Sequence, residues 1–212
     1  MSASRSWLAT LFAAALAGLL GGCASLQPIP DDERFYTLAP PEGVDMAPAS
    51  GSGVRPSVGI HVDIHADYLR EPAMVVRASR NEVRFERGHR WAGRLDDDLE
   101  RALTAALQQD LGAASVAPVL SGARATVDVL IDIRLVACEG TTDGAAVLEA
   151  FWEVTTLATP GAGAAGHFRG QKDGWNGTDF GQLAAMLSTL VEELAGEIAP
   201  EAQAGSTAET GA

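Results

Sequence analysis

The chain has 212 residues, 47% of them hydrophobic, and a formal net charge of −13 because 28 acidic residues oppose 15 basic ones. Two cysteines can close at most one bridge, so the chain is not a disulfide-rich scaffold, and its hydrophobic content excludes a wholly disordered protein. The acidic balance has the wrong sign for neutralising phosphates, which excludes nucleic acid as the expected partner. A chain of this length can bury a sizeable core unaided.

The first 22 residues have the pattern of an export signal. Arg5 precedes an apolar run from Trp7 to Leu20, and Gly21 and Gly22 stand directly before Cys23. The run is shorter than the roughly 20 apolar residues that a membrane-spanning helix needs. The Leu-x-Gly-Cys ending resembles the bacterial lipobox, in which the cysteine sulfur receives a diacylglycerol. We therefore predict a lipoprotein signal peptide over residues 1–22 and a lipid anchor on Cys23.

The residues after Cys23 indicate where such an anchor would be placed. Ala24 and Ser25 follow the cysteine, with no aspartate at the second position. In lipoproteins of Gram-negative bacteria this pattern favours the outer membrane, so the predicted location is its periplasmic face. Residues 23–33 are expected to form the lipidated N-terminus and a tether. Acylation of Cys23 leaves Cys138 without a disulfide partner, and we expect an unreactive thiol there.

The first half of the folded part alternates between apolar and polar residues and then changes to helical spacing. Alternation is typical of half-buried strands, and the polar turn at 79–81 indicates a hairpin. Leu95, Leu99 and Leu103 recur at helical spacing, which predicts a helix over 93–111 that ends at Gly112. The strands expected here cover residues 34–38, 58–64, 73–78 and 82–87.

The second half repeats this plan. Three alternating segments are followed by Leu183, Leu187 and Leu190 at helical spacing, which predicts a helix from about residue 178 that stops at Pro200. We predict an α+β fold: a single domain over residues 34–199, with an antiparallel or mixed sheet and two amphipathic helices packed on one face, followed by a disordered tail over 200–212. Trp152, Leu103 and Leu190 are expected in one core. The strands expected in this half cover residues 126–137, 145–157 and 166–171.

The sheet face turned away from the helices is expected to be mostly polar, with apolar residues interspersed. Such a mixed patch resembles a protein interface more than a lipid pocket. It favours contact with a partner protein or self-assembly into a ring-like homo-oligomer. Arg90 and Trp91 precede the first helix; core packing is the first interpretation for them and partner binding the second. The interspersed apolar residues are Leu130, Val136, Val147 and Phe151.

Patterns that would carry enzymatic or metal chemistry are weak in this sequence. His61, Asp63 and His65 share one strand face, but a solvated polar face explains them better than a metal site. Glu149 and Glu153 alternate on another strand and have the same simple interpretation. The chain contains no Gly-x-Ser-x-Gly nucleophile motif. We therefore predict no catalytic residues, no metal and no cofactor.

A family resemblance lies in the run from Asp67 to Leu95. Tyr68-Leu69, Arg70 with Pro72, Val75-Val76-Arg77 and Arg90-Trp91-Ala92-Gly93-Arg94-Leu95 resemble the motifs of the ABC-type transport auxiliary lipoproteins, the PqiC-like family. Two departures are visible: Arg94 replaces the proline expected before Leu95, and Glu71 separates Arg70 from Pro72.

The resemblance implies an outer-membrane lipoprotein that accompanies a transporter carrying mammalian-cell-entry (MCE) domains in lipid traffic between the two membranes. The leading hypothesis is a non-enzymatic accessory that docks the periplasmic MCE component at the outer membrane. The alternative is a periplasmic carrier that binds lipid itself. A lipid-anchored enzyme is the third hypothesis, and no sequence feature supports it.

Overall fold

The computed structural model describes residues 32–43, 57–112, 115–119, 127–157 and 163–207. The predicted signal peptide and Cys23 lie outside these residues, and so does the end of the predicted tail. The elements in chain order are β1 (Arg34–Tyr36), β2 (Ser57–Ile64), the 3-10 helix η2 (Asp67–Arg70), β3 (Ala73–Ser79), β4 (Glu82–Trp91), α2 (Leu95–Leu111), β5 (Ser115–Pro118), β6 (Val129–Thr141), β7 (Ala145–Thr156), β8 (Gly163–Asp173) and α3 (Phe180–Thr207).

Strand β6 organises the sheet. On one side it pairs with β7, which pairs with β8, and both ladders are antiparallel. On the other side two strands follow each other along β6: β2 pairs in parallel with Val129–Leu135, and β3 pairs in parallel with Gly140 and Thr141. β5 extends β2, while β4 and then β1 extend β3, which completes eight strands in one mixed sheet. The predicted α+β class and the β3–β4 hairpin are confirmed.

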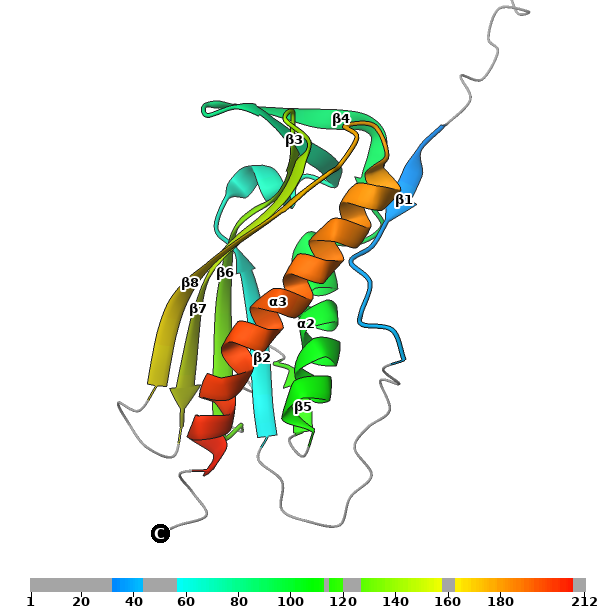
Figure 1. Ribbon diagram of the computed structural model, residues 1–212. Helices are drawn as coiled ribbons and strands as arrows, with labels where there is room; N and C mark the ends of the chain where they lie inside the picture. The colour runs from blue at the N-terminus through cyan, green and yellow to red at the C-terminus, as the bar shows by residue number, and fades with distance from the viewer. Residues whose placement is uncertain (1–31, 44–56, 113–114, 120–126, 158–162, 208–212) are drawn as a thin grey trace, which may run out of the picture. The chain divides into compact units, whose positions relative to one another are not determined.

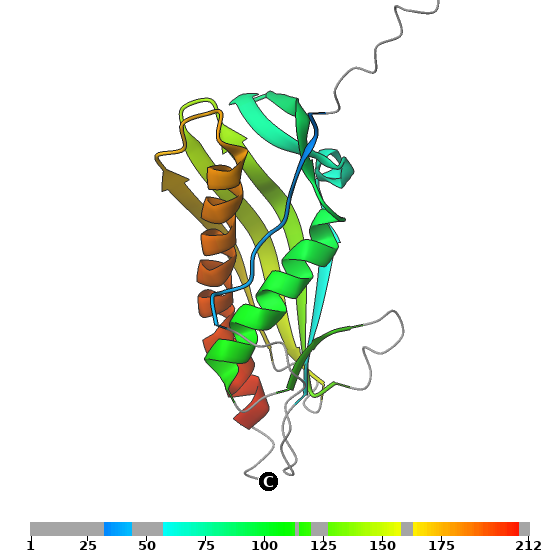
Figure 2. The ribbon, with the colours of Figure 1, turned by 90° about the vertical axis from the view of Figure 1, so that its right-hand side faces the viewer.

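Helices α2 and α3 lie side by side on one face of the sheet (Figures 1 and 2). Their apolar stripes and the facing strand residues form a single buried cluster that contains Leu103, Trp152 and Leu190, as predicted. Asp179 begins α3, since its carboxylate accepts the backbone N–H of Gln182 at 3.0 Å. Within the described residues, neither helix is long and apolar enough to cross a membrane.

A β-bulge divides β6 into two halves. Leu135 pairs with Ala150 of β7 but Ala137 pairs with Glu149, so Val136 is an extra residue on the β6 side. Before the bulge, odd-numbered residues such as Ile133 face the helices. After the bulge, even-numbered residues face the helices instead. Cys138 therefore joins the core, and Glu139 lies on the opposite face. The predicted alternation is therefore correct only as far as the bulge.

The predicted end of the last helix is wrong, because α3 continues through Pro200 to Thr207. Proline lacks the N–H that would donate to residue 196 and crowds that residue's carbonyl. Residue 196 is a glycine, and nothing lies within 4 Å of where its Cβ would be. Ala199 and Ala202 are buried in the core. Packing of the last turns against the sheet thus outweighs the local cost of the proline.

The face opposite the helices, called the open face below, is less apolar at its surface than we predicted. Leu130 and Val147 are buried, although both belong to this face. Val119 and Val127 lie over Gly59, the register partner of Leu130, and Val147 stands opposite the buried Glu139. The predicted mixed patch is therefore not one continuous exposed surface.

Candidate functional site

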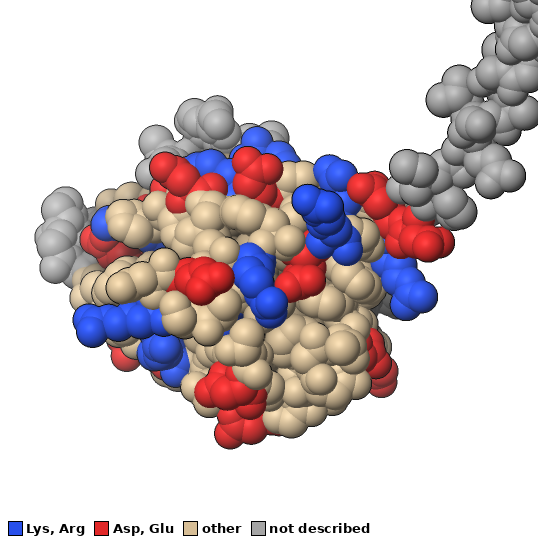
Figure 3. Space-filling view, turned by 90° about the horizontal axis from the view of Figure 1, so that it is seen from above, with Lys and Arg blue, Asp and Glu red and all other residues tan. Residues whose placement is uncertain are grey.

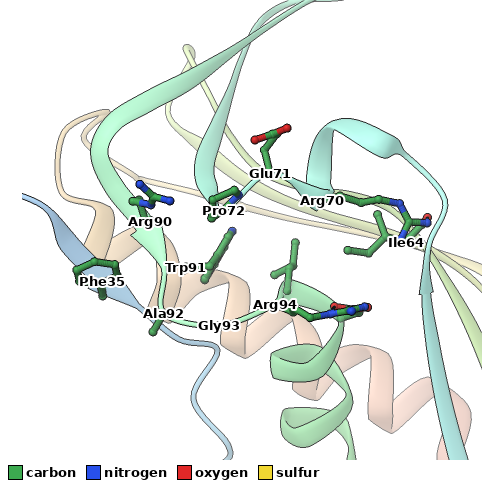
Figure 4. A pocket seen from close by; sticks show the side chains of 12 residues that line it. Phe35, Ile64, Arg70, Glu71, Pro72, Arg90, Trp91, Ala92, Gly93 and Arg94 are labelled. Atoms are coloured by element: carbon green, nitrogen blue, oxygen red, sulfur yellow. Dashed lines mark hydrogen bonds and ion pairs between the residues drawn. The ribbon is translucent and has the colours of Figure 1, made fainter. Parts of the chain in front are cut away.

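The family motifs converge on one pocket at the end of the domain that carries β1 and the β3–β4 hairpin. The pocket has a volume of about 580 Å³. Its walls come from β1, from the η2–β3 connection and from the β4–α2 connection, and Trp91 stands between Pro72 and the start of α2 (Figure 4). Arg70, Glu71 and Pro72 of the first motif thus face Arg90 to Leu95 of the second. These two motifs are 20 residues apart in the sequence, so the fold brings them together.

Backbone hydrogen bonds fix the walls of this pocket. The N–H of Trp91 donates to the carbonyl of Pro72 at 2.8 Å, and the N–H of Ala92 donates to the carbonyl of Tyr36 at 2.7 Å. The end of β4 is therefore held between the η2–β3 connection and β1. Trp91 is buried, whereas Phe35 on the β1 wall is 60% exposed.

The arginines around the pocket are neutralised by nearby carboxylates. Arg90 pairs with Glu33 at 2.9 Å, and Arg94 binds Asp96 through two nitrogens. The Arg94 guanidinium lowers the pKa of the Asp96 carboxyl, although partial burial of that carboxyl opposes the effect. Figure 3 looks onto this end and shows both signs of charge interspersed with uncharged groups. The pocket is therefore not a dedicated anion site.

Two further motif residues, Tyr68 and Arg77, form a polar network around the buried Glu139. Glu139 has a side chain only 3% exposed and accepts hydrogen bonds from Tyr68 Oη at 2.9 Å and from Arg77 Nη2 at 3.2 Å, with a further bond from Arg77 Nε. Arg77 also donates to Tyr68 Oη at 3.1 Å. Because these residues belong to η2, β3 and β6, the network fastens the motif-bearing segment to the centre of the sheet.

Tyr68 is expected to ionise only at strongly alkaline pH. Burial, and then the adjacent Glu139 carboxylate, raise its pKa from near 10 to about 12. A group whose pKa is raised by folding stabilises the protein at pH values below the pKa that the group has in the unfolded chain. The free energy of unfolding should therefore fall as the pH rises from about 10 to about 12. Absorbance titration of phenolate in a Tyr36→Phe variant isolates Tyr68, since the chain has two tyrosines. A midpoint near 10 would contradict the network.

The five predicted partner-binding residues do not lie together. Arg90 and Trp91 meet at the pocket, Leu130 and Val147 are buried, and Phe151 is 48% exposed on the open face. The Phe151 ring stacks on His167 with 4.5 Å between centroids.

Glu149 adjoins this aromatic pair. It accepts from His167 Nε2 at 2.9 Å and pairs with Arg169. Phe151 is therefore an exposed aromatic residue next to a cluster of charged side chains.

Two other predicted features have a structural account. Among the described residues, no group of His, Cys, Asp and Glu side chains could hold a metal ion, and this includes His61, Asp63 and His65. Cys138 is fully buried, and burial raises the pKa of its thiol well above the usual range.

Glu139 was not predicted as important; the only signal for it was a lone carboxylate following Ala137 and Cys138 in a strand.

The fold and the pocket define the class of this protein: an α+β domain in which the paired arginine motifs meet at one end. The chain matches the ABC-type transport auxiliary lipoprotein component family over residues 36–199 and belongs to that family. Membership assigns it an accessory role in transport and an association with the cell envelope. No curated protein matches it.

Two crystal structures share the fold. One, of an uncharacterized protein, is 21% identical with a TM-score of 0.63, and the alignment covers 80% of this chain and 97% of the other. The second, a DUF330 protein from Xanthomonas campestris, is 20% identical with a TM-score of 0.63 and coverage of 84% and 99%. A PelC dodecamer from Paraburkholderia phytofirmans is 13% identical, covering 69% of this chain and 88% of its own. Its TM-score of 0.38 is too low to support an argument about assembly.

Proposed function

We propose that this protein is a non-enzymatic outer-membrane lipoprotein that docks the periplasmic MCE component of an ABC-type transport system at the outer membrane. Cys23 holds the domain on the membrane, and the open face contacts the partner or a second copy of the chain. The observation that carries the proposal is Phe151, an exposed aromatic ring among charged side chains on the sheet face opposite α2 and α3. Family membership supplies the transport context.

The arrangement of charges supports docking over lipid carriage. Holding an acyl chain out of water requires an apolar cavity, at about 0.8 kcal/mol for each buried CH₂. The apolar face of the sheet is filled by α2 and α3, and their side chains form one cluster with it. The pocket near Trp91 is rimmed by ion-paired arginines. These features suit a scaffold better than a carrier.

The anchor is tested by replacing its cysteine. Cys23→Ala should leave the protein unprocessed or soluble, because stable attachment of a lipoprotein needs two or more acyl chains. Fractionation of membranes, with mass spectrometry of the N-terminus, provides the measurement. Retention of the variant in the outer membrane after cleavage at the same bond would contradict the anchor.

Docking is tested by capture of the periplasmic MCE protein on the acylated chain. Phe151→Asp should weaken capture roughly tenfold or more, as expected for an aromatic anchor at the centre of an interface. Leu157→Asp is the matched control, since Leu157 directly follows β7 and is 39% exposed. Native mass spectrometry of the acyl-free domain should show no bound phospholipid. One phospholipid per protomer would instead support the carrier hypothesis.

A further inference from the structure

We infer that the end of the domain carrying β1 and the β3–β4 hairpin is a membrane-contacting surface that seats on the lipid headgroup layer. The inference rests on the proposed lipid anchor, but it concerns a different part of the protein. It assigns a role to Phe35, Phe85 and the arginines of the hairpin, which docking through the open face does not use.

Two exposed phenylalanines mark this end. Phe35 of β1 is 60% exposed and Phe85 of β4 is 45% exposed. Phe35 lines the pocket near Trp91, and Phe85 lines a neighbouring pocket of about 420 Å³. Pro72 and Arg90 line both pockets, so Phe35 and Phe85 lie on either side of these two residues. Exposed aromatic rings next to arginine are the composition of surfaces that insert into the headgroup region.

The anchored part of the chain joins the folded domain at this end. Ten residues lie between Cys23 and Arg34, the first residue of β1. Fully extended, they reach at most about 40 Å from the acylated sulfur. α2 begins beside Trp91 at this same end and, with 17 residues, extends about 25 Å away from it. The chain that follows Cys23 therefore enters the folded domain at the end that carries β1, and α2 runs away from that point of entry.

The charge of the hairpin tip favours anionic lipid. Residues 79–88 contain Arg80, Arg84 and Arg87 against Glu82 and Glu86, a net charge of 3 − 2 = +1, whereas the whole chain carries −13. Among the described residues, no ion pair involves Arg80 or Arg87. Carboxylates more than about 10 Å away are largely screened at physiological salt. Glu33 and Glu71 also line the pocket beside Phe85, so the attraction to a negatively charged leaflet comes from the arginines of the hairpin and not from the whole end of the domain.

Depth-dependent fluorescence quenching tests this surface directly. Phe85→Trp is compared with Phe151→Trp in the acylated full-length protein, on vesicles of phosphatidylcholine and phosphatidylglycerol with brominated acyl chains. The two positions are similarly exposed, at 45% and 48%, so solvent access is matched. We expect the tryptophan at 85 to shift to the blue and to be quenched, and the tryptophan at 151 to be unaffected. Equal quenching at both positions would overturn the inference.

A second measurement needs no aromatic substitution. Amide hydrogen exchange of residues 79–88 should slow at least severalfold on phosphatidylglycerol-containing vesicles, and the protection should be lost in Arg84→Glu with Arg87→Glu. Arg134→Glu on the open face is the control. Unchanged exchange at the hairpin overturns the inference, as does protection by the MCE protein without lipid. Mass spectrometry of Cys23 in the same sample reports whether the anchor itself is present, so the two failures are distinguishable.

Discussion

Leu103→Ala or Leu190→Ala is expected to lower the free energy of unfolding by about 2–5 kcal/mol. Both leucines are completely buried, one in each helix, and both belong to the single cluster between the helices and the sheet. Leu190 additionally lies against Gly170 of β8, where even a Cβ would be too close. Little room therefore exists for neighbouring side chains to close a cavity. Denaturant unfolding followed by circular dichroism measures the change.

Leu157→Ala is the control for these variants, because its side chain is 39% exposed. It should change stability by less than about 0.5 kcal/mol. If the two buried leucines behaved like Leu157, the helices would not pack on the sheet as described.

Glu139→Ala is expected to lower the free energy of unfolding by about 2–4 kcal/mol. Removing one member of a buried ion pair leaves the other without compensation, a loss of about 3–5 kcal/mol when both members are buried. Arg77 is 32% exposed, so part of its guanidinium can be rehydrated and the loss is somewhat smaller. Tyr68 also loses its acceptor. Thermal and denaturant unfolding should both report the change.

Two comparisons separate the network from a general effect of losing a carboxylate. Glu149→Ala removes a glutamate from the same face, but its partner Arg169 is 60% exposed, so the cost should be below about 1 kcal/mol. Glu139→Leu combined with Arg77→Met should recover most of the stability, because apolar residues can replace a buried pair. If Glu139→Ala lowered the free energy of unfolding no more than Glu149→Ala does, the network around Glu139 would not stabilise the fold.

Much of the fold could be predicted from the sequence because its core residues are periodic. Ile131, Ile133 and Leu135 face the helices as the alternation indicated, and the leucines of α2 and α3 form the expected stripes. The prediction failed where a long-range contact decides the outcome. Pro200 is a local helix breaker, yet the burial of Ala199 and Ala202 keeps α3 intact around it.

The candidate site was only partly predictable for the same reason. The motifs identified Arg90 and Trp91 as important, and both line the pocket. Periodicity alone could not show that Leu130 and Val147 are covered, because the residues that cover this face come from other segments of the chain. Glu139 was missed because its significance depends on Tyr68 and Arg77, which lie more than 60 residues away in the sequence.

The bulge at Val136 makes the length of β6 as important as its composition. A regular ladder that kept Val136 would shift the register with β7 by one residue and turn everything after it to the other face. Glu139 would then point into the apolar layer beneath α3, and Cys138 would take its place beside Arg77. In this strand the bulge, rather than the composition of the residues after it, therefore decides which side chains enter the core.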